Sequence, residues 1–139
     1  MNGSKYARTA WLRWTIAWLG AAALGVANGA ARGALYENRI GPRAAHYVST
    51  ATLLLLLSAY IRRLSSIWPI PSRADALTIG GAWCGLTIAF EFGFGHLVAG
   101  ESWSALLAQY NVARGKVWVL IPIWMAIGPA PWSCTGLLR

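Results

Sequence analysis

Four apolar segments, at residues 11–31, 44–61, 76–99 and 117–132, limit what this chain of 139 residues can fold into. A helix needs about 20 mostly apolar residues to cross a bilayer, and the first three segments approach or exceed that length. The fourth is shorter, and its internal Pro122 is expected to kink a helix. None alternates apolar and polar residues as barrel strands do. The sequence therefore predicts an all-α integral membrane four-helix bundle that forms a single domain.

The composition and the charge agree with a membrane protein. Hydrophobic residues make up 57% of the chain and charged residues 12%, whereas soluble domains carry about 25% charged residues. The net charge is +8, but the basic residues flank the apolar segments and do not line one helix face. Because no DNA- or RNA-binding motif accompanies them, nucleic acid is not an expected partner. Membrane lipids are the expected partners instead.

The flanking basic residues predict an orientation. With the N-terminus in the cytoplasm, seven of them lie inside and five outside, as the positive-inside rule prefers. The seven are Lys5, Arg8, Arg13, Arg62, Arg63, Arg73 and Arg139, and the five are Arg32, Arg39, Arg43, Arg114 and Lys116. An alternative is that the N-terminal segment is a cleaved signal peptide. Its length and its tryptophans favour a retained span.

Alternating spans bring most acids and both imidazoles to one end of the bundle, which we call the polar pole. Its members are Asn28, Arg32, Glu37, His46, Glu91, His96, Glu101, Arg114 and Lys116. The connection at residues 100–115 adds Trp103, Leu106, Leu107 and Tyr110 at helical spacing, after Ser102 as a candidate N-cap. This pattern predicts a short helix between spans three and four. It lies either in the membrane interface or against the bundle.

Glu91 is the first candidate catalytic residue. It lies seven residues before Val98 in the third apolar segment, about 10 Å from the helix end at 1.5 Å per residue. A carboxylate at that depth should be protonated or paired, and it marks either a functional site or a structural contact between helices. Arg32 is the expected partner, because it shares a helix face with Asn28 and has a long side chain. The alternative for Arg32 is that its side chain extends to the membrane interface and keeps its charge in water.

His46 is the second candidate catalytic residue, as a proton partner, and Ser49 and Thr50 follow it at i+3 and i+4. The alternative is an interfacial histidine bonded to a backbone carbonyl. His96 follows Glu91 by five residues and should point roughly 140° away from it. His46, His96 and Glu91 offer an alternative metal site, but they lack a metal-ligand spacing, so neither a metal nor another cofactor is expected.

Several residues of the polar pole are candidate ligand-binding residues: Asn28, Arg32, His96, Tyr110, Asn111, Arg114 and Lys116. Grouped cations beside a membrane bind phosphate head groups, although they are also ordinary flanking charges. We expect binding or modification of an anionic lipid or amphiphile, with Glu91 as acid or base and Arg32 and Lys116 as anchors. The alternatives are a proton-coupled transporter or channel subunit, and a structural or assembly protein without catalysis.

Small residues at four-residue spacing suggest helix packing or association. Gly25 and Gly29 form one such pair, and Gly81 and Gly85 form another. Pairs of this kind let helix backbones approach closely, either within the chain or in a homo-oligomer or a complex with a partner membrane protein.

The chain resembles a family of small, uncharacterised bacterial four-span integral membrane proteins. The resemblance covers residues 28–118, and the motifs that carry it are Asn28-Gly29 with Arg32, Gly41-Pro42 with Ala45-His46 and Ser49, Phe90-Glu91-Phe92-Gly93 with Gly95-His96, Ser102-Trp103, Leu106-Leu107, Tyr110-Asn111, Gly115 and Trp118. It implies a multi-pass protein of the bacterial cytoplasmic membrane. It implies no particular activity.

Overall fold

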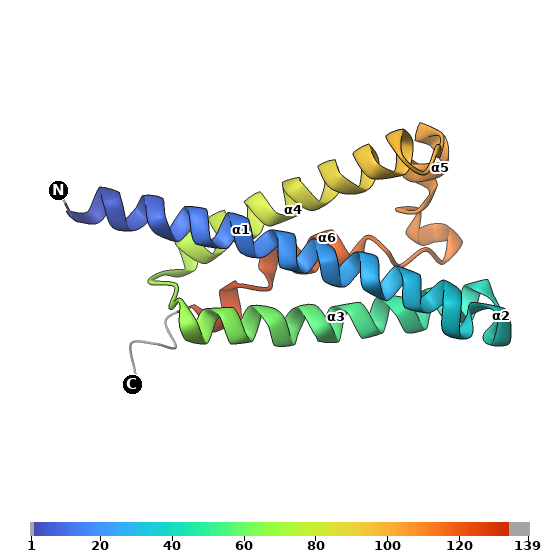
Figure 1. Ribbon diagram of the computed structural model, residues 1–139, viewed down its shortest axis with the longest axis horizontal. Coiled ribbons are helices and arrows are strands. Elements are labelled where there is room, and N and C mark those ends of the chain that lie inside the picture. The colour runs from blue at the N-terminus through green and yellow to red at the C-terminus, as the bar shows by residue number, and fades with distance from the viewer. Residues whose placement is uncertain (1, 134–139) are drawn as a thin grey trace.

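The computed structural model describes residues 2–133, with side chains from residue 8 onward. This part of the chain is all-helical and contains three long apolar helices and a shorter one (Figure 1). The α-helices are α1 (Asn2–Ala31), α2 (Glu37–Ile40), α3 (Pro42–Ile67), α4 (Arg73–Leu97), α5 (Trp103–Ala108) and α6 (Leu120–Ile127). The arrangement is compatible with the predicted helical bundle. Its three long helices are long and apolar enough to cross a membrane.

Different helices and connections lie at the two ends of the bundle, as the alternating spans predicted. The start of α1 and the link between α3 and α4 lie at one end, whereas α2, the start of α3, and α5 lie at the other (Figure 1). The second end is the polar pole. Two of the cations used to predict the orientation, Lys5 and Arg139, lie outside the residues whose side chains are described.

The first helix is longer than the predicted segment, which ended at residue 31. Helix α1 continues through a π-helical turn, Arg32–Tyr36, into α2, so the helical path ends only at Ile40. Gly41 ends it with a positive φ of 87°, a conformation that glycine adopts without steric cost. Pro42 then begins α3, where its missing N–H costs nothing.

Helices α4 and α5 each begin directly after a serine that caps the helix N-terminus. The Ser72 side chain accepts a hydrogen bond of 3.0 Å from the Asp75 N–H at the start of α4. Ser102 likewise accepts a bond of 3.1 Å from Ala105 and begins α5. The predicted short helix and its cap are therefore present. It ends at Ala108, so Tyr110 lies beyond its end, where the sequence pattern had placed it on the helix.

The fourth apolar segment is shorter as a helix than predicted. Helix α6 has eight residues, and a 3-10 turn at Ala130–Trp132 follows Pro129. The kink expected at Pro122 does not form, because Pro122 lies in the first turn of α6, where an N–H is not needed. The Trp118 carbonyl, four residues before Pro122, accepts a bond of 3.0 Å from Ile121 instead. Together α6 and this turn form a shorter apolar helical segment, Leu120–Trp132, which begins three residues later than predicted and ends at the predicted residue.

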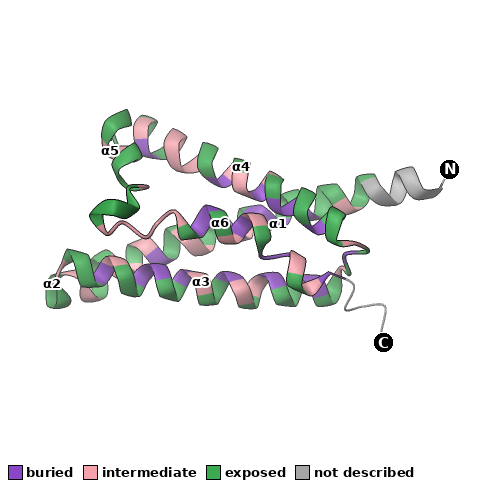
Figure 2. Cartoon of the chain, turned by 180° about the vertical axis from the view of Figure 1, so that it is seen from behind, coloured by how far each residue is buried: buried purple, intermediate pink, exposed green. Residues whose placement is uncertain are grey.

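Tryptophans join α1 to α4 in the core away from the polar pole. Trp83 donates its indole N–H to the Trp14 carbonyl at 2.9 Å, and Trp18 donates to the Thr87 hydroxyl at 3.0 Å. Trp14 and Trp83 are almost fully buried. Figure 2 shows the buried residues along the faces where the helices meet. These contacts fix α1 and α4 together at one end only.

The close helix contact lies at a different glycine from those predicted. No atom of a neighbouring element lies within 4 Å of the position a Cβ would take at Gly25, Gly29, Gly81 or Gly85. A Cβ at Gly80, in contrast, would collide with the Ala126 carbonyl of α6. The two predicted glycine pairs thus make no helix contact in the described chain. Gly80 is the glycine that brings α4 against α6.

Candidate functional site

Glu91 is held by two neutral hydrogen-bond donors at the polar pole. Its Oε2 accepts a hydrogen bond from the Tyr110 hydroxyl, and its Oε1 accepts one of 2.7 Å from the Trp118 indole N–H. Tyr110 follows α5 and Trp118 precedes α6, so the carboxylate joins α4 to both ends of the intervening connection. Glu91 is partly buried. It therefore has polar partners, as predicted, but they are not the predicted Arg32.

An aromatic stack holds Tyr110 in place. Its ring lies 5.7 Å from that of Phe92 at 18°, and Phe92 stacks in turn on Trp103 at 6.4 Å. Burial, and then the hydrogen bond to Glu91, raise the pKa of Tyr110 well above its ordinary value near 10. The hydroxyl therefore keeps its proton and remains a donor to the carboxylate.

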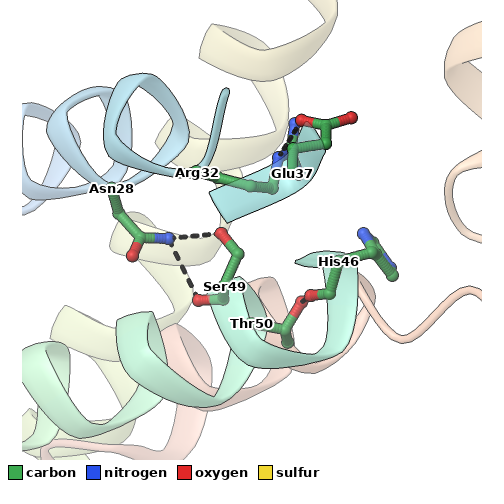
Figure 3. Close-up of polar contacts among 6 residues, drawn as sticks. All are labelled: Asn28, Arg32, Glu37, His46, Ser49 and Thr50. Carbon is green, nitrogen blue, oxygen red and sulfur yellow. Dashed lines mark hydrogen bonds and ion pairs between the residues drawn. The ribbon is translucent and has the colours of Figure 1, made fainter. Parts of the chain in front are cut away.

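Arg32 pairs with Glu37. Its Nε lies 3.4 Å from Glu37 Oε2, and both side chains are about one-third exposed, at 32% and 34% (Figure 3). The atoms are close enough for an ion pair but are not aligned for a hydrogen bond. The π-helical turn explains the pair, because it brings residues five apart above one another. An ordinary α-helix would place them on different faces.

Asn28 contributes to packing between α1 and α3. Its Nδ2 donates to the Ser49 carbonyl at 3.0 Å and to the Ser49 hydroxyl at 2.7 Å (Figure 3). Both residues are buried. The amide donor of this predicted ligand-binding residue is therefore used within the chain.

His46 lies next to Trp118 and faces away from Asn28 (Figure 3). Its Nε2 accepts a hydrogen bond of 3.3 Å from the Val117 N–H, so this nitrogen carries no proton and the ring is neutral. The predicted alternative was a bond to a backbone carbonyl, whereas the partner is a backbone N–H. The rings of His46 and Trp118 are 6.4 Å apart, which places Trp118 between His46 and Glu91.

Two cations lie within electrostatic range of His46. Lys116 and Arg32 are close enough for their charges to act on its ring. Neither forms an ion pair with Glu91 among residues 8–133. The polar pole thus has a basic part around His46 and an acidic part at Glu91, with Trp118 between them.

The remaining predicted site residues lie apart from Glu91. His96 stacks on Trp103 at 4.0 Å, and its Nδ1 lies 2.9 Å from the Glu101 carbonyl oxygen. Asn111 and Arg114 are exposed on the connection between α5 and α6. Within the described residues, no three His, Cys, Asp or Glu side chains gather as metal ligands.

Two cavities meet at Glu91 and Trp118, which line both of them. The first has a volume of about 140 Å³ and lies between α1, α3, α4 and α6, with Trp18, Gly25 and Leu53 on its wall. The second has about 180 Å³ and lies between α4, α5 and the connection to α6. Glu91 is therefore within reach of a molecule in either cavity.

The sequence alone did not indicate Trp118 as a partner of Glu91 or Glu37 as the partner of Arg32. The first contact joins residues 27 apart across an irregular connection, and no local spacing signals it. The second depends on a π-helical turn, which helical periodicity does not predict.

The comparisons with known proteins identify no relative of the chain. No family model, curated protein or solved structure matches it. Membership of the bacterial four-span family stays a prediction from the sequence motifs.

Proposed function

We propose that this chain is a multi-pass protein of the bacterial cytoplasmic membrane that binds an anionic amphiphile at its polar pole. Three helices of sufficient length and apolar character support insertion into a membrane. The basic residues that flank them favour a cytoplasmic N-terminus, which would put the polar pole on the outer face. The observation that carries the proposal is that two cations act on His46, whose ring neighbours Trp118, and that Trp118 lines an apolar cavity.

The basic part of the pole suits an anionic head group. Lys116 and Arg32 both lie near His46, and within residues 8–133 Lys116 forms no ion pair. Glu37 offsets Arg32 only through a contact that is partly exposed to solvent. Basic residues near a membrane surface attract anionic lipids by about 1 kcal/mol each. A phosphate or carboxylate bound here would balance the uncompensated charge of Lys116.

The apolar cavity suits part of a hydrocarbon chain. Trp18 and Gly25 of α1 and Arg32, the first residue of the π-helical turn that continues α1, follow one another at intervals of seven residues, so they share one face of the helical path. The cavity lined by Trp18 and Gly25 thus lies along the face that ends at Arg32. Its volume of about 140 Å³ is close to that of a cavity known to admit benzene. Glu91 lines the same cavity and would be the acid or base toward a bound molecule.

Native mass spectrometry with phosphatidylglycerol tests the proposal. We expect the double variant Arg32→Gln/Lys116→Gln to retain this lipid about thirtyfold less than the wild type, because two attractive charges are lost. The matched control is Arg63→Gln/Arg73→Gln, which removes two exposed cations from the opposite end of the bundle and should retain lipid normally. Equal retention in both double variants would contradict the proposal.

A second candidate function is a structural one, in which the polar groups only fix helix packing. The two hydrogen bonds of Glu91 to the connection between α5 and α6 favour it. It predicts that Glu91→Gln lowers the unfolding temperature and leaves every bound molecule in place. An amphiphile site predicts instead that bound lipid is lost from Arg32→Gln/Lys116→Gln, whose substitutions leave both hydrogen bonds of Glu91 in place.

A further inference from the structure

Among residues 8–133, no basic side chain forms an ion pair with the carboxylate of Glu91. Its partners, the Tyr110 hydroxyl and the Trp118 indole, are both neutral. Among residues 8–133, the acid that forms an ion pair with a basic side chain is Glu37. Lys116 and Arg32 act on His46, on the other side of Trp118. A partly buried carboxylate requires a proton or a cation from elsewhere.

The cavity on the α5 side of Glu91 has aromatic walls. It has a volume of about 180 Å³, and aromatic side chains border it together with the carboxylate: Phe90, Phe92, Phe94, Tyr110 and Trp118. Gln109, which is exposed, forms part of its edge and leaves a path to solvent. Aromatic faces attract cations, and cages of such rings recognise alkylated ammonium groups.

The carboxylate keeps free acceptor positions for a ligand. Two carboxylate oxygens offer about four lone-pair positions, and one on each oxygen is used by Tyr110 or Trp118. The volume of about 180 Å³ slightly exceeds that of a cavity that admits benzene. One small ammonium group with its attached carbons therefore fits.

We propose that this cavity binds an organic ammonium group, whose charge is held by Glu91 and whose carbon atoms pack against the surrounding rings. The proposal goes beyond the anionic amphiphile and does not depend on it, since that head group is held by Arg32 and Lys116 beyond Trp118. A proton alone on Glu91 is the competing explanation for how the carboxylate is neutralised.

Fluorescence titration of the purified chain in a maltoside detergent tests the proposal, because this detergent carries no ammonium group. Tetramethylammonium chloride and ethylammonium chloride are the two probes, and sodium chloride is the control for ionic strength. We expect a saturable change in tryptophan fluorescence with at least one probe, since Trp118 lies in the cavity wall. Stronger binding of tetramethylammonium would assign the affinity to the rings. Stronger binding of ethylammonium would assign it to hydrogen bonds with Glu91.

Glu91→Gln keeps the size of the side chain and removes its charge, so it should weaken binding about tenfold or more. Glu101→Gln is the matched control, because Glu101 is an exposed acid at the same pole. Phe94→Leu gives a second variant if Glu91→Gln fails to fold. Phe94 is 45% exposed, and its loss should weaken tetramethylammonium binding severalfold without disturbing the core.

Two results would overturn the inference: a wild-type response no different from that with sodium chloride, or equal affinities for Glu91→Gln and Glu101→Gln. The double variant Arg32→Gln/Lys116→Gln should bind both probes like the wild type. Failure of ammonium binding would leave lipid retention by Arg32 and Lys116 untouched, so the two proposals fail separately.

Discussion

At the scale of single residues, the Glu91 carboxylate is oriented before any ligand arrives. The Tyr110 hydroxyl and the Trp118 indole each hold one oxygen, and the Phe92 ring stacks on Tyr110. Preorganised polar groups in a water-poor site act more strongly than mobile ones in water. Tyr110 therefore positions the Glu91 carboxylate and also attaches the connection between α5 and α6 to α4.

The raised pKa of Tyr110 predicts a loss of stability at alkaline pH. In the unfolded chain the hydroxyl loses its proton near pH 10, whereas in the folded chain it keeps it to higher pH. Its contribution to stability is thus complete below about pH 10 and is lost as the pH rises toward the folded pKa. Thermal unfolding from about pH 8 to about pH 11 should show a steeper decline for the wild type than for Tyr110→Phe. Parallel declines would contradict this.

The residue types of the site could be predicted from the sequence, but their pairings could not. A carboxylate deep in an apolar segment needs polar partners, so Glu91 was identifiable as a site residue. Its partners lie 19 and 27 residues away, on a connection whose path depends on α5, on the 3-10 turn at Val112–Arg114 and on Gly115. Arg32 had a plausible reach toward Glu91. Its pairing was decided by the π-helical turn.

At the scale of elements, α6 packs against α4 at a glycine. Gly80 faces the Ala126 carbonyl so closely that a Cβ would collide with backbone. Gly81, one residue on, is exposed and has no atom of another element within 4 Å of the same position. The two glycines therefore differ in environment while sharing a helix.

This contrast predicts opposite effects of the same substitution. Gly80→Ala should lower the free energy of unfolding by about 1–3 kcal/mol, because α6 must shift to admit the methyl group. Gly81→Ala should leave it unchanged or raise it by up to about 1 kcal/mol, since alanine favours the helix. Denaturant titration followed by circular dichroism measures both. If Gly81→Ala lowered the free energy of unfolding as much as Gly80→Ala does, α4 and α6 would not meet as described.

Element types were predictable where periodicity or capping dictated them. The three long apolar helices, the Gly41-Pro42 break and the Ser102 cap all follow from local chemistry. The continuation of the first helix to Ile40 did not, because its last turns combine polar and apolar residues that also suit a loop. Pro122 predicted a kink only on the assumption that α6 began before residue 120.

At the scale of the whole molecule, packing and polar chemistry lie at different ends. The contacts of Trp14, Trp18 and Trp83 fix α1 to α4 away from the polar pole. Toward the pole, the cavity beside Gly25 lies between the same two helices. The two helices are therefore joined by direct contacts at one end and separated by a cavity toward the other.

We infer that the polar pole around Glu91 is a binding site and not only a set of packing contacts. The direct test is mass spectrometry of the small molecules and lipids that co-purify with the wild type and with Glu91→Gln, each from bacterial membranes in a maltoside detergent. A binding site that includes Glu91 predicts a molecule that is retained by the wild type and lost from Glu91→Gln at equal helix content. Identical sets of bound molecules from the two proteins, with only the unfolding temperature of Glu91→Gln lowered, would contradict it.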